Sequence, residues 1–156
     1  MIKLVRMDEP TFQFFLKQST RDYAEDKVRI GAWEQDTAMQ LSRDEMNRYL
    51  PKGLHTEGAF LYSIVEDTGN TQAGYIWFNV AQGRQDKEAF IYDFYIFEPY
   101  QQKGYGSMAL TLLDEEARSM GVTRIGLHVF GDNDRAFKLY QKLGYGITDI
   151  TMSKKL

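Results

Sequence analysis

The sequence predicts an α/β protein of the α+β kind, with a mixed, mostly antiparallel sheet of six to seven strands and helices on both faces. Three observations predict this class. Strand-like segments occupy both ends and the middle of the chain, amphipathic helical segments separate them, and a strand–helix–strand segment around Gly104 requires one parallel pair. The expected order is β-αα-βββ-α-β-α-ββ, in a single domain spanning residues 1–156.

The first third predicts a strand and two helices. Residues 2–7 alternate as a strand does, and Asp8 with Pro10 is a helix-start signal. A second helical stretch runs from Trp33 to Leu50 and is closed by Pro51.

The middle of the chain predicts three consecutive strands in an antiparallel meander. Residues 60–66, 74–80 and 89–97 are rich in aromatic and β-branched side chains, and turn sequences separate them. Residues 68–70, Thr-Gly-Asn, predict a hairpin turn.

The last third alternates between helix and strand. Residues 105–120 predict an amphipathic helix, residues 124–130 a strand, and Asp132 or Asn133 the cap of another helix. Residues 146–156 predict one or two final strands.

Composition excludes several classes of function. The chain has no cysteine, so it has no disulfide, thiolate metal site or cysteine nucleophile. Its two histidines, His55 and His128, are far apart, and we expect no metal. The net charge of -3, without a basic cluster, argues against nucleic acid. No signal peptide or run of eighteen apolar residues is present, so we expect a cytoplasmic protein without membrane association.

A glycine loop is the most informative stretch. A strand ending near Phe97 is followed by Gly104-Tyr105-Gly106, which opens a helix. Glycines let successive N–H groups converge, and a helix N-terminus adds partial positive charge, so a pyrophosphate fits there. A plain tight turn is the alternative. A Rossmann turn, G-x-G-x-x-A with Ala109, lacks the acidic residue expected after the next strand, and no P-loop motif occurs.

Two motifs carry a family resemblance. Gln101-x-x-Gly104-x-Gly106 resembles the [QR]-x-x-G-x-[GA] acyl-CoA signature of the GCN5-related N-acetyltransferases (GNATs). Residues 133–145 resemble the family's N-x-x-A-x-x-L-Y-x-x-x-G-[FY] stretch. The order of elements is also the family's, and residues 90–94, 127–130 and 152–156 look similar to the YycN-type bacterial acetyltransferases.

The resemblance implies acetyl-CoA as the acyl donor. Backbone amides of the glycine loop would hold the pyrophosphate, and the preceding strand would pair with the pantetheine arm, with an amide near Ile96 polarising the thioester carbonyl. Asn133 would contact the arm or cap its helix, and Lys103 would add charge or be solvated. The implied contacts are Phe94, Tyr95, Ile96, Phe97, Gln101, Gln102, Lys103, Gly104, Tyr105, Gly106, Ser107, Asn133 and Tyr140.

Catalysis needs an acid and a base. By the resemblance Tyr140 is the general acid; without the motif it would be a core tyrosine. A lysine-like amine, with a pKa of about 10.4, is protonated at neutral pH and needs a base. His128 is the first candidate, because histidine exchanges protons near neutrality, and Asp93 is the second. A water-mediated route stays open.

The expected activity is N-acetylation of a primary amine, of small-molecule or peptide type, by direct transfer in a ternary complex. Tyr23, Trp33 and Trp77 are candidates for the acceptor site, although aromatic residues at such spacings also form cores. A non-catalytic acyl-CoA-binding module and a Rossmann-type nucleotide-binding protein are the alternatives. A homodimer is left open.

Overall fold

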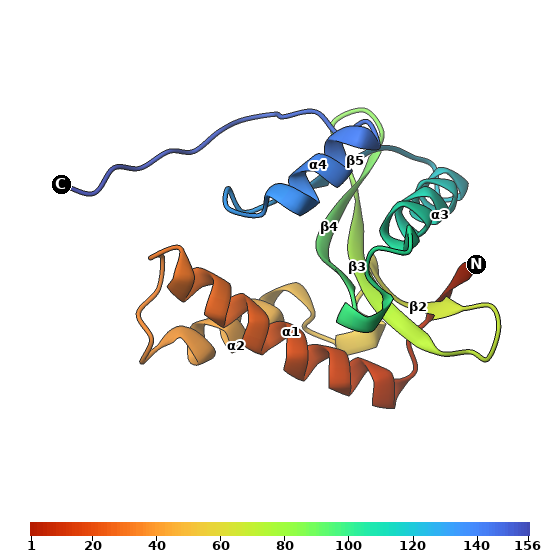
Figure 1. Cartoon of the computed structure of the whole chain (residues 1–156), viewed down its shortest axis with the longest axis horizontal. Coiled ribbons are helices and arrows are strands. Elements are labelled where there is room, and N and C mark those ends of the chain that lie inside the picture. Colours follow the sequence, from red (N-terminus) through yellow and green to blue (C-terminus); the bar gives the residue numbers. More distant parts are fainter.

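A computed structural model describes residues 1–156, and it contains one five-stranded sheet with helices on both of its faces (Figure 1). The predicted class is confirmed. The elements are β1 (Ile2–Arg6), α1 (Glu9–Arg29), α2 (Ala38–Tyr49), β2 (Ala59–Glu66), β3 (Gln72–Gln82), β4 (Lys87–Ile96), α3 (Tyr105–Ser119), β5 (Val122–Leu127) and α4 (Asp134–Lys142). Short 3₁₀ turns lie at Gly53–His55 and Glu98–Tyr100.

The strands lie side by side in chain order, and only the last pair is parallel. β1 to β4 pair antiparallel, while β4 and β5 run parallel and are joined by α3. The turn between β2 and β3 places Gly69 and Asn70 at φ 87° and 53°, which suits the predicted hairpin. The meander and the crossover helix are both confirmed.

Alternating side chains divide the core between the two faces of the sheet. Tyr75 and Trp77 of β3 pack with Phe15 of α1 and with α2. Ile76 and Phe78, on the opposite face, pack with α3 and α4. α1 begins as its sequence predicts, since the Asp8 carboxylate accepts the Thr11 N–H at 2.9 Å and Pro10 occupies the first turn.

A β-bulge in β4 changes which way its later side chains point. Trp77 lies opposite Asp93 but Phe78 lies opposite Ile91, so Tyr92 is an extra residue on β4. Ile91 packs toward α3, whereas Asp93, two residues on, reaches Ser19 of α1. Without the bulge, strand alternation would turn Asp93 toward α3.

Two expectations about the C-terminal third are wrong. The sheet has five strands rather than six or seven, because residues 146–156 form no strand and extend away from the body (Figure 1). The fifth strand ends at Leu127 rather than at residue 130, because β4 and β5 pair no further than Ile91 and Leu127 and then diverge. The second helix also begins later than expected, at Ala38.

Candidate active site

A cavity of about 690 Å³ opens where β4 and β5 diverge. Its walls come from α1 and α2 on one side and from residues 127–133 with α4 on the other. The structure thereby brings together eight residues that the sequence singles out: Tyr23, Trp77, Asp93, Phe94, Tyr95, His128, Asn133 and Tyr140.

Asp93 is partly buried in this cavity, and the hydroxyl of Ser19 donates a short hydrogen bond to its carboxylate. Burial raises the pKa of Asp93 to about 6, and the Ser19 hydrogen bond opposes that rise. A carboxyl group with this pKa is ionised at neutral pH yet accepts a proton readily. Ser19 is a site residue that the sequence analysis missed. It is a buried polar residue on the face of α1 that packs against the sheet, and a serine among the apolar residues of that face is the feature that could have indicated it.

Tyr140 lies on α4 and is partly buried in the wall of the same cavity. Burial, and after it the charge of Asp93, raises the pKa of Tyr140 to about 12. The phenol therefore keeps its proton at neutral pH. Its acidity also depends on Asp93, because protonation of that carboxylate removes the charge that opposes loss of the phenol proton.

His128 differs from Asp93 in its surroundings. It follows the end of β5, its side chain is exposed, and its ring packs edge-on against Phe130 at a centroid distance of 5.1 Å. It lines the cavity, so both candidate bases face the same space. Asp93 is the more enclosed of the two, and burial raises its pKa.

The glycine loop presents unpaired donors to solvent. None of the six backbone N–H groups from Gln102 to Ser107 donates a hydrogen bond within the protein. Gln102 and Gly104 have φ values of 63° and 81°, and alternation of this kind turns neighbouring amides toward one side. Gly104 is the N-cap of α3 and offers no side chain to it, whereas Asn133 caps α4 through the Ala136 N–H at 3.3 Å. The loop therefore fits an anionic group such as a pyrophosphate.

Gln101 connects the two sequence motifs. Its amide nitrogen donates to the Ile96 carbonyl at 2.8 Å, and its amide oxygen accepts from the Arg135 guanidinium at 3.1 Å. Arg135 thus brings a positive charge to the loop from the first turn of α4. The sequence reasoning did not assign it a role, although it lies inside the second motif.

The backbone of Ile96 faces the open side of β4. Phe97 donates its N–H to the Ala73 carbonyl of the neighbouring segment at 2.8 Å. Because successive N–H groups of a strand point to opposite sides, the Ile96 N–H points away from β3, toward the gap that β5 leaves. A peptide-like chain lying in that gap would meet it.

Carboxylates and aromatic rings form the part of the cavity on the side of α1 and α2. Five carboxylic residues line the cavity as a whole, namely Asp22, Glu25, Asp26, Glu45 and Asp93. Lys27 is the one lysine in the lining. Tyr75 is 1% exposed and also lines the cavity. Burial and then the charge of Asp93 raise the pKa of Tyr75 well above its usual value.

Of the three aromatic residues proposed for the acceptor site, two line the cavity and one does not. Tyr23 lines the cavity, and Trp77 lies in its floor, where its indole N–H donates to Asn79 at 2.7 Å. Trp33 is not part of the lining. It packs edge-on against Tyr23 at 5.4 Å, and the Lys27 ammonium lies over both rings. Trp33 therefore supports Tyr23.

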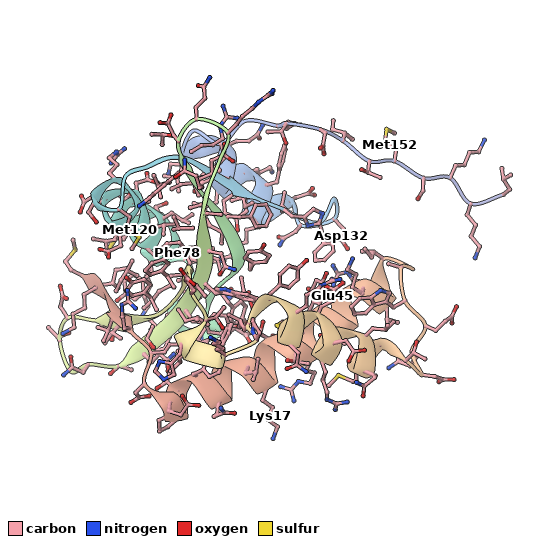
Figure 2. The ribbon with its side chains drawn as sticks, turned by 180° about the vertical axis from the view of Figure 1, so that it is seen from behind. Lys17, Glu45, Phe78, Met120, Asp132 and Met152 are labelled. Carbon is pink, nitrogen blue, oxygen red and sulfur yellow. The ribbon has the colours of Figure 1, made fainter.

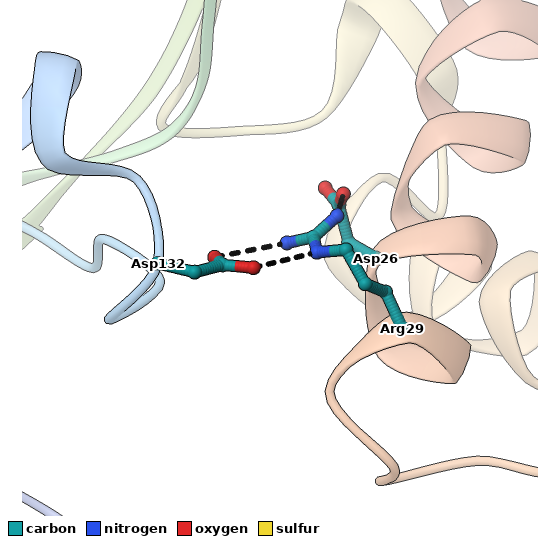
Figure 3. Close-up of polar contacts among 3 residues, drawn as sticks. All are labelled: Asp26, Arg29 and Asp132. Atoms are coloured by element: carbon teal, nitrogen blue, oxygen red, sulfur yellow. Dashed lines mark hydrogen bonds and ion pairs between the residues drawn. The ribbon is translucent and has the colours of Figure 1, made fainter.

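An ion pair crosses from α1 to the loop that precedes α4. Arg29 binds the Asp132 carboxylate, with 2.9 Å from Nε to Oδ2, and also contacts Asp26 on its own helix (Figure 3). Asp26 lines the cavity and Asp132 lies two residues beyond Phe130, which does so too. Arg29 thus joins the two walls and neutralises part of the charge of Asp26.

No cluster of three or more histidine, aspartate or glutamate side chains could hold a metal ion. None of the helices is both long and apolar enough to span a membrane.

The order of the elements, the one parallel strand pair and the glycine loop with its unpaired amides together define one class of enzymes. The chain belongs to the acetyltransferase (GNAT) family, whose family model matches residues 19–145. It is 41% identical over 155 residues to the N-acetyltransferase YycN of Bacillus subtilis (strain 168), itself uncharacterized, with 99% of both chains covered. YdgE, an uncharacterized N-acetyltransferase of the same organism, is 35% identical over 150 residues, which cover 96% of this chain and 95% of YdgE.

The crystal structure of YycN superposes on this protein with a TM-score of 0.95 and covers 100% of this chain and 99% of YycN.

Proposed function

We propose that this protein transfers the acetyl group of acetyl-CoA to a primary amine by direct attack in a ternary complex. One observation carries the proposal: Asp93 and Tyr140 face a single cavity beside a strand and a helix N-terminus whose amides are unpaired. The absence of cysteine agrees with direct transfer, since the chain has no thiol that could carry the acetyl group.

In this mechanism the chain's own groups bind, polarise and exchange protons. The loop amides from Gln102 to Ser107 hold the pyrophosphate, and Arg135 adds positive charge. The Ile96 N–H donates to the thioester carbonyl oxygen and stabilises the negative charge that develops there. The exposed edge of β4 pairs with the pantetheine arm.

Asp93 and Tyr140 divide the proton transfers. The Asp93 carboxylate takes a proton from the ammonium, and the free amine nitrogen attacks the thioester carbon. The C–N bond forms, the C–S bond breaks, and the CoA thiolate takes the Tyr140 proton, while the acetylated nitrogen gives up its second proton, which restores the Tyr140 phenol. Once Asp93 is protonated, its charge no longer raises the pKa of Tyr140, so the acid strengthens as the base is used. His128 is the alternative base.

The acceptor is an amine that carries further positive charge. Four carboxylates besides Asp93 line the cavity, and the aromatic rings of Tyr23 and Trp77 can lie against a cation. Diamines and lysine-containing peptides share this chemistry, and both fit the small-molecule or peptide acceptor expected from the sequence.

The test measures thiol release from acetyl-CoA with a panel of mono-, di- and peptide amines. Tyr140→Phe should lower kcat about a hundredfold while acetyl-CoA still raises Tm, because only the proton donor is removed. Tyr145→Phe is the matched control, since Tyr145 does not line the cavity. A Tm rise with acetyl-CoA but no turnover of any amine would instead favour an acyl-CoA-binding module, and a rise with NAD alone would contradict the proposal.

A further inference from the structure

Lys27 is a primary amine that the chain itself brings to the cavity. It lies near the C-terminal end of α1 and is partly buried, and it is the one lysine in the cavity lining. It belongs to the wall that α1 and α2 form, which is the wall proposed for the acceptor amine. A group of the acceptor's own chemical kind is therefore part of the acceptor site.

Aromatic rings hold the Lys27 ammonium. Its Nζ atom lies 5.4 Å from the centroid of the Tyr23 ring and 5.5 Å from the centroid of the Trp33 ring. Lys27 takes no part in the ion pairs of the protein, all of which are made by Arg29 and Arg48. A cation–π contact is weak where the cation stays partly solvated, and lysine has a flexible four-carbon stem. The amine can therefore leave the rings and move within the cavity.

The Lys27 side chain runs toward the proposed catalytic groups. Side chains of a helix lean toward its N-terminus, and the Lys27 ammonium accordingly lies over Tyr23, which is one turn earlier in α1. One turn further in the same direction is Ser19, whose hydroxyl donates to the Asp93 carboxylate. Because a turn advances about 5.4 Å along the helix axis, the amine needs to move by about that distance along α1 to reach the level of the proposed base.

We propose that Lys27 is acetylated in the active site of its own chain, an inference that rests on the proposed acetyl transfer. The Asp93 carboxylate takes one proton from the Lys27 ammonium, and the Nζ atom attacks the thioester carbon of acetyl-CoA. The C–N bond forms, the C–S bond breaks, and the CoA thiolate takes the Tyr140 proton. The acetylated nitrogen gives up its second proton, which restores the Tyr140 phenol.

Acetylation would change the charge of the acceptor site. An acetylated lysine is uncharged, so the cavity would lose its one lysine charge while its five carboxylic residues remain. The neutral amide also gives up the cation–π contacts with Tyr23 and Trp33. The modified protein is thus a chemically distinct form, which arises when acetyl-CoA is bound and no amine competes for the cavity.

Lys17 lies on the same helix and serves as the internal reference. It is exposed, is not part of the cavity lining, and projects from α1 away from the sheet (Figure 2). Acetylation of Lys17 by acetyl-CoA in solution reports the uncatalysed reaction of a surface lysine. Both lysines react in the same sample, so the ratio of their rates does not depend on the acetyl-CoA concentration.

Peptide mass mapping over time tests the proposal. With acetyl-CoA and no added amine, the parent protein should acetylate Lys27 at least about tenfold faster than Lys17, because only Lys27 has a proton donor and a base beside it. In Tyr140→Phe the Lys27 rate should fall at least about tenfold and the Lys17 rate should not change. A rise in Tm with acetyl-CoA shows that this variant is folded and binds the donor. Equal rates at both lysines in the parent protein, or a Lys27 rate unchanged in Tyr140→Phe, would overturn the proposal.

Two further measurements identify the modified residue and the route of transfer. Lys27→Arg keeps a cation beside the rings but has no primary amine there, so intact mass spectrometry should show that the fast acetylation is lost. The rate constant at Lys27 should not change when the protein is diluted, since the amine and the active site are on one chain. A rate constant that falls in proportion to the dilution would show transfer between chains and contradict the proposal.

Thiol release with the amine panel, measured on the same protein, separates the acetylation of Lys27 from the proposed function. Turnover of an added amine without acetylation of Lys27 would overturn the acetylation of Lys27 alone. No turnover of any amine together with no acetylation of Lys27 would contradict both.

Discussion

At the scale of single residues, Asp93 shows a conflict between stability and chemistry. Its folded-state pKa of about 6 lies above the ordinary value of 3.8, because burial penalises the charged form. The folded protein therefore holds this proton more tightly than the unfolded chain does. The resulting stabilisation is complete below about pH 4 and is lost as the pH rises through 6. At neutral pH the protein carries an ionised buried carboxylate at a cost in stability.

Asp93→Asn should therefore stabilise the protein and inactivate it. At pH 7 the gain in unfolding free energy should approach about 3 kcal/mol, less whatever the Ser19 contact contributes, and it should disappear toward pH 4. Denaturant unfolding at both pH values measures it, beside an assay of acetyl transfer. Asp22→Asn is the control, because it makes the same change of carboxylate to amide in the same cavity, at a side chain that contacts Gln18 rather than Ser19. Equal stability of Asp93→Asn and the parent at both pH values would contradict this account.

The protonation states of Asp93 and Tyr140 depend on each other, and this coupling also belongs to the scale of single residues. Neither side chain contacts the other through a hydrogen bond, yet the charge of one contributes to the pKa of the other. Such coupled groups titrate together, so a pH–rate profile reports the pair. The rising limb near pH 6 should belong mainly to Asp93, since its pKa is the one that burial moves into this range.

At the scale of elements, α3 has an N-terminus without a side-chain cap. α1 and α4 both have side-chain caps, from Asp8 and Asn133. α3 begins at Gly104 and leaves its first amides unpaired. Unpaired donors at a helix end cost stability in the free protein, and they become useful when an anion binds them.

Ser107→Asp should separate the effect of the unpaired amides on helix stability from their effect on anion binding. A carboxylate in the first turn of α3 should stabilise the helix by about 0.3–1 kcal/mol through the helix dipole, and it should weaken acetyl-CoA binding at least about tenfold by repelling the pyrophosphate. Thermal unfolding and calorimetric titration measure the two effects. Thr111→Asp, one turn further along α3, is the control and should leave the affinity nearly unchanged. Unaltered affinity in Ser107→Asp would place the pyrophosphate elsewhere.

At the scale of the whole molecule, two layers meet over the cavity. α1 and α2 cover one face of the sheet, and α3 and α4 cover the other (Figure 1). The cavity opens at the end where β4 and β5 separate. The Arg29–Asp132 pair joins these walls at the surface (Figure 3). Both of its side chains are largely exposed, so it positions the walls more than it stabilises the fold.

The sequence by itself determined the order of the elements, because periodicity, caps and turn residues act over a few neighbours along the chain. It also located the glycine loop and the second motif, whose spacings are local. Tertiary structure decided what depends on distant partners. The bulge at Tyr92 turned Asp93 toward Ser19, and the loss of pairing beyond Leu127 ended β5 early and opened the cavity. Residues 146–156 have a strand-like composition, yet a segment forms a strand only where another strand edge lies beside it. Whether such an edge lies beside it depends on the tertiary structure.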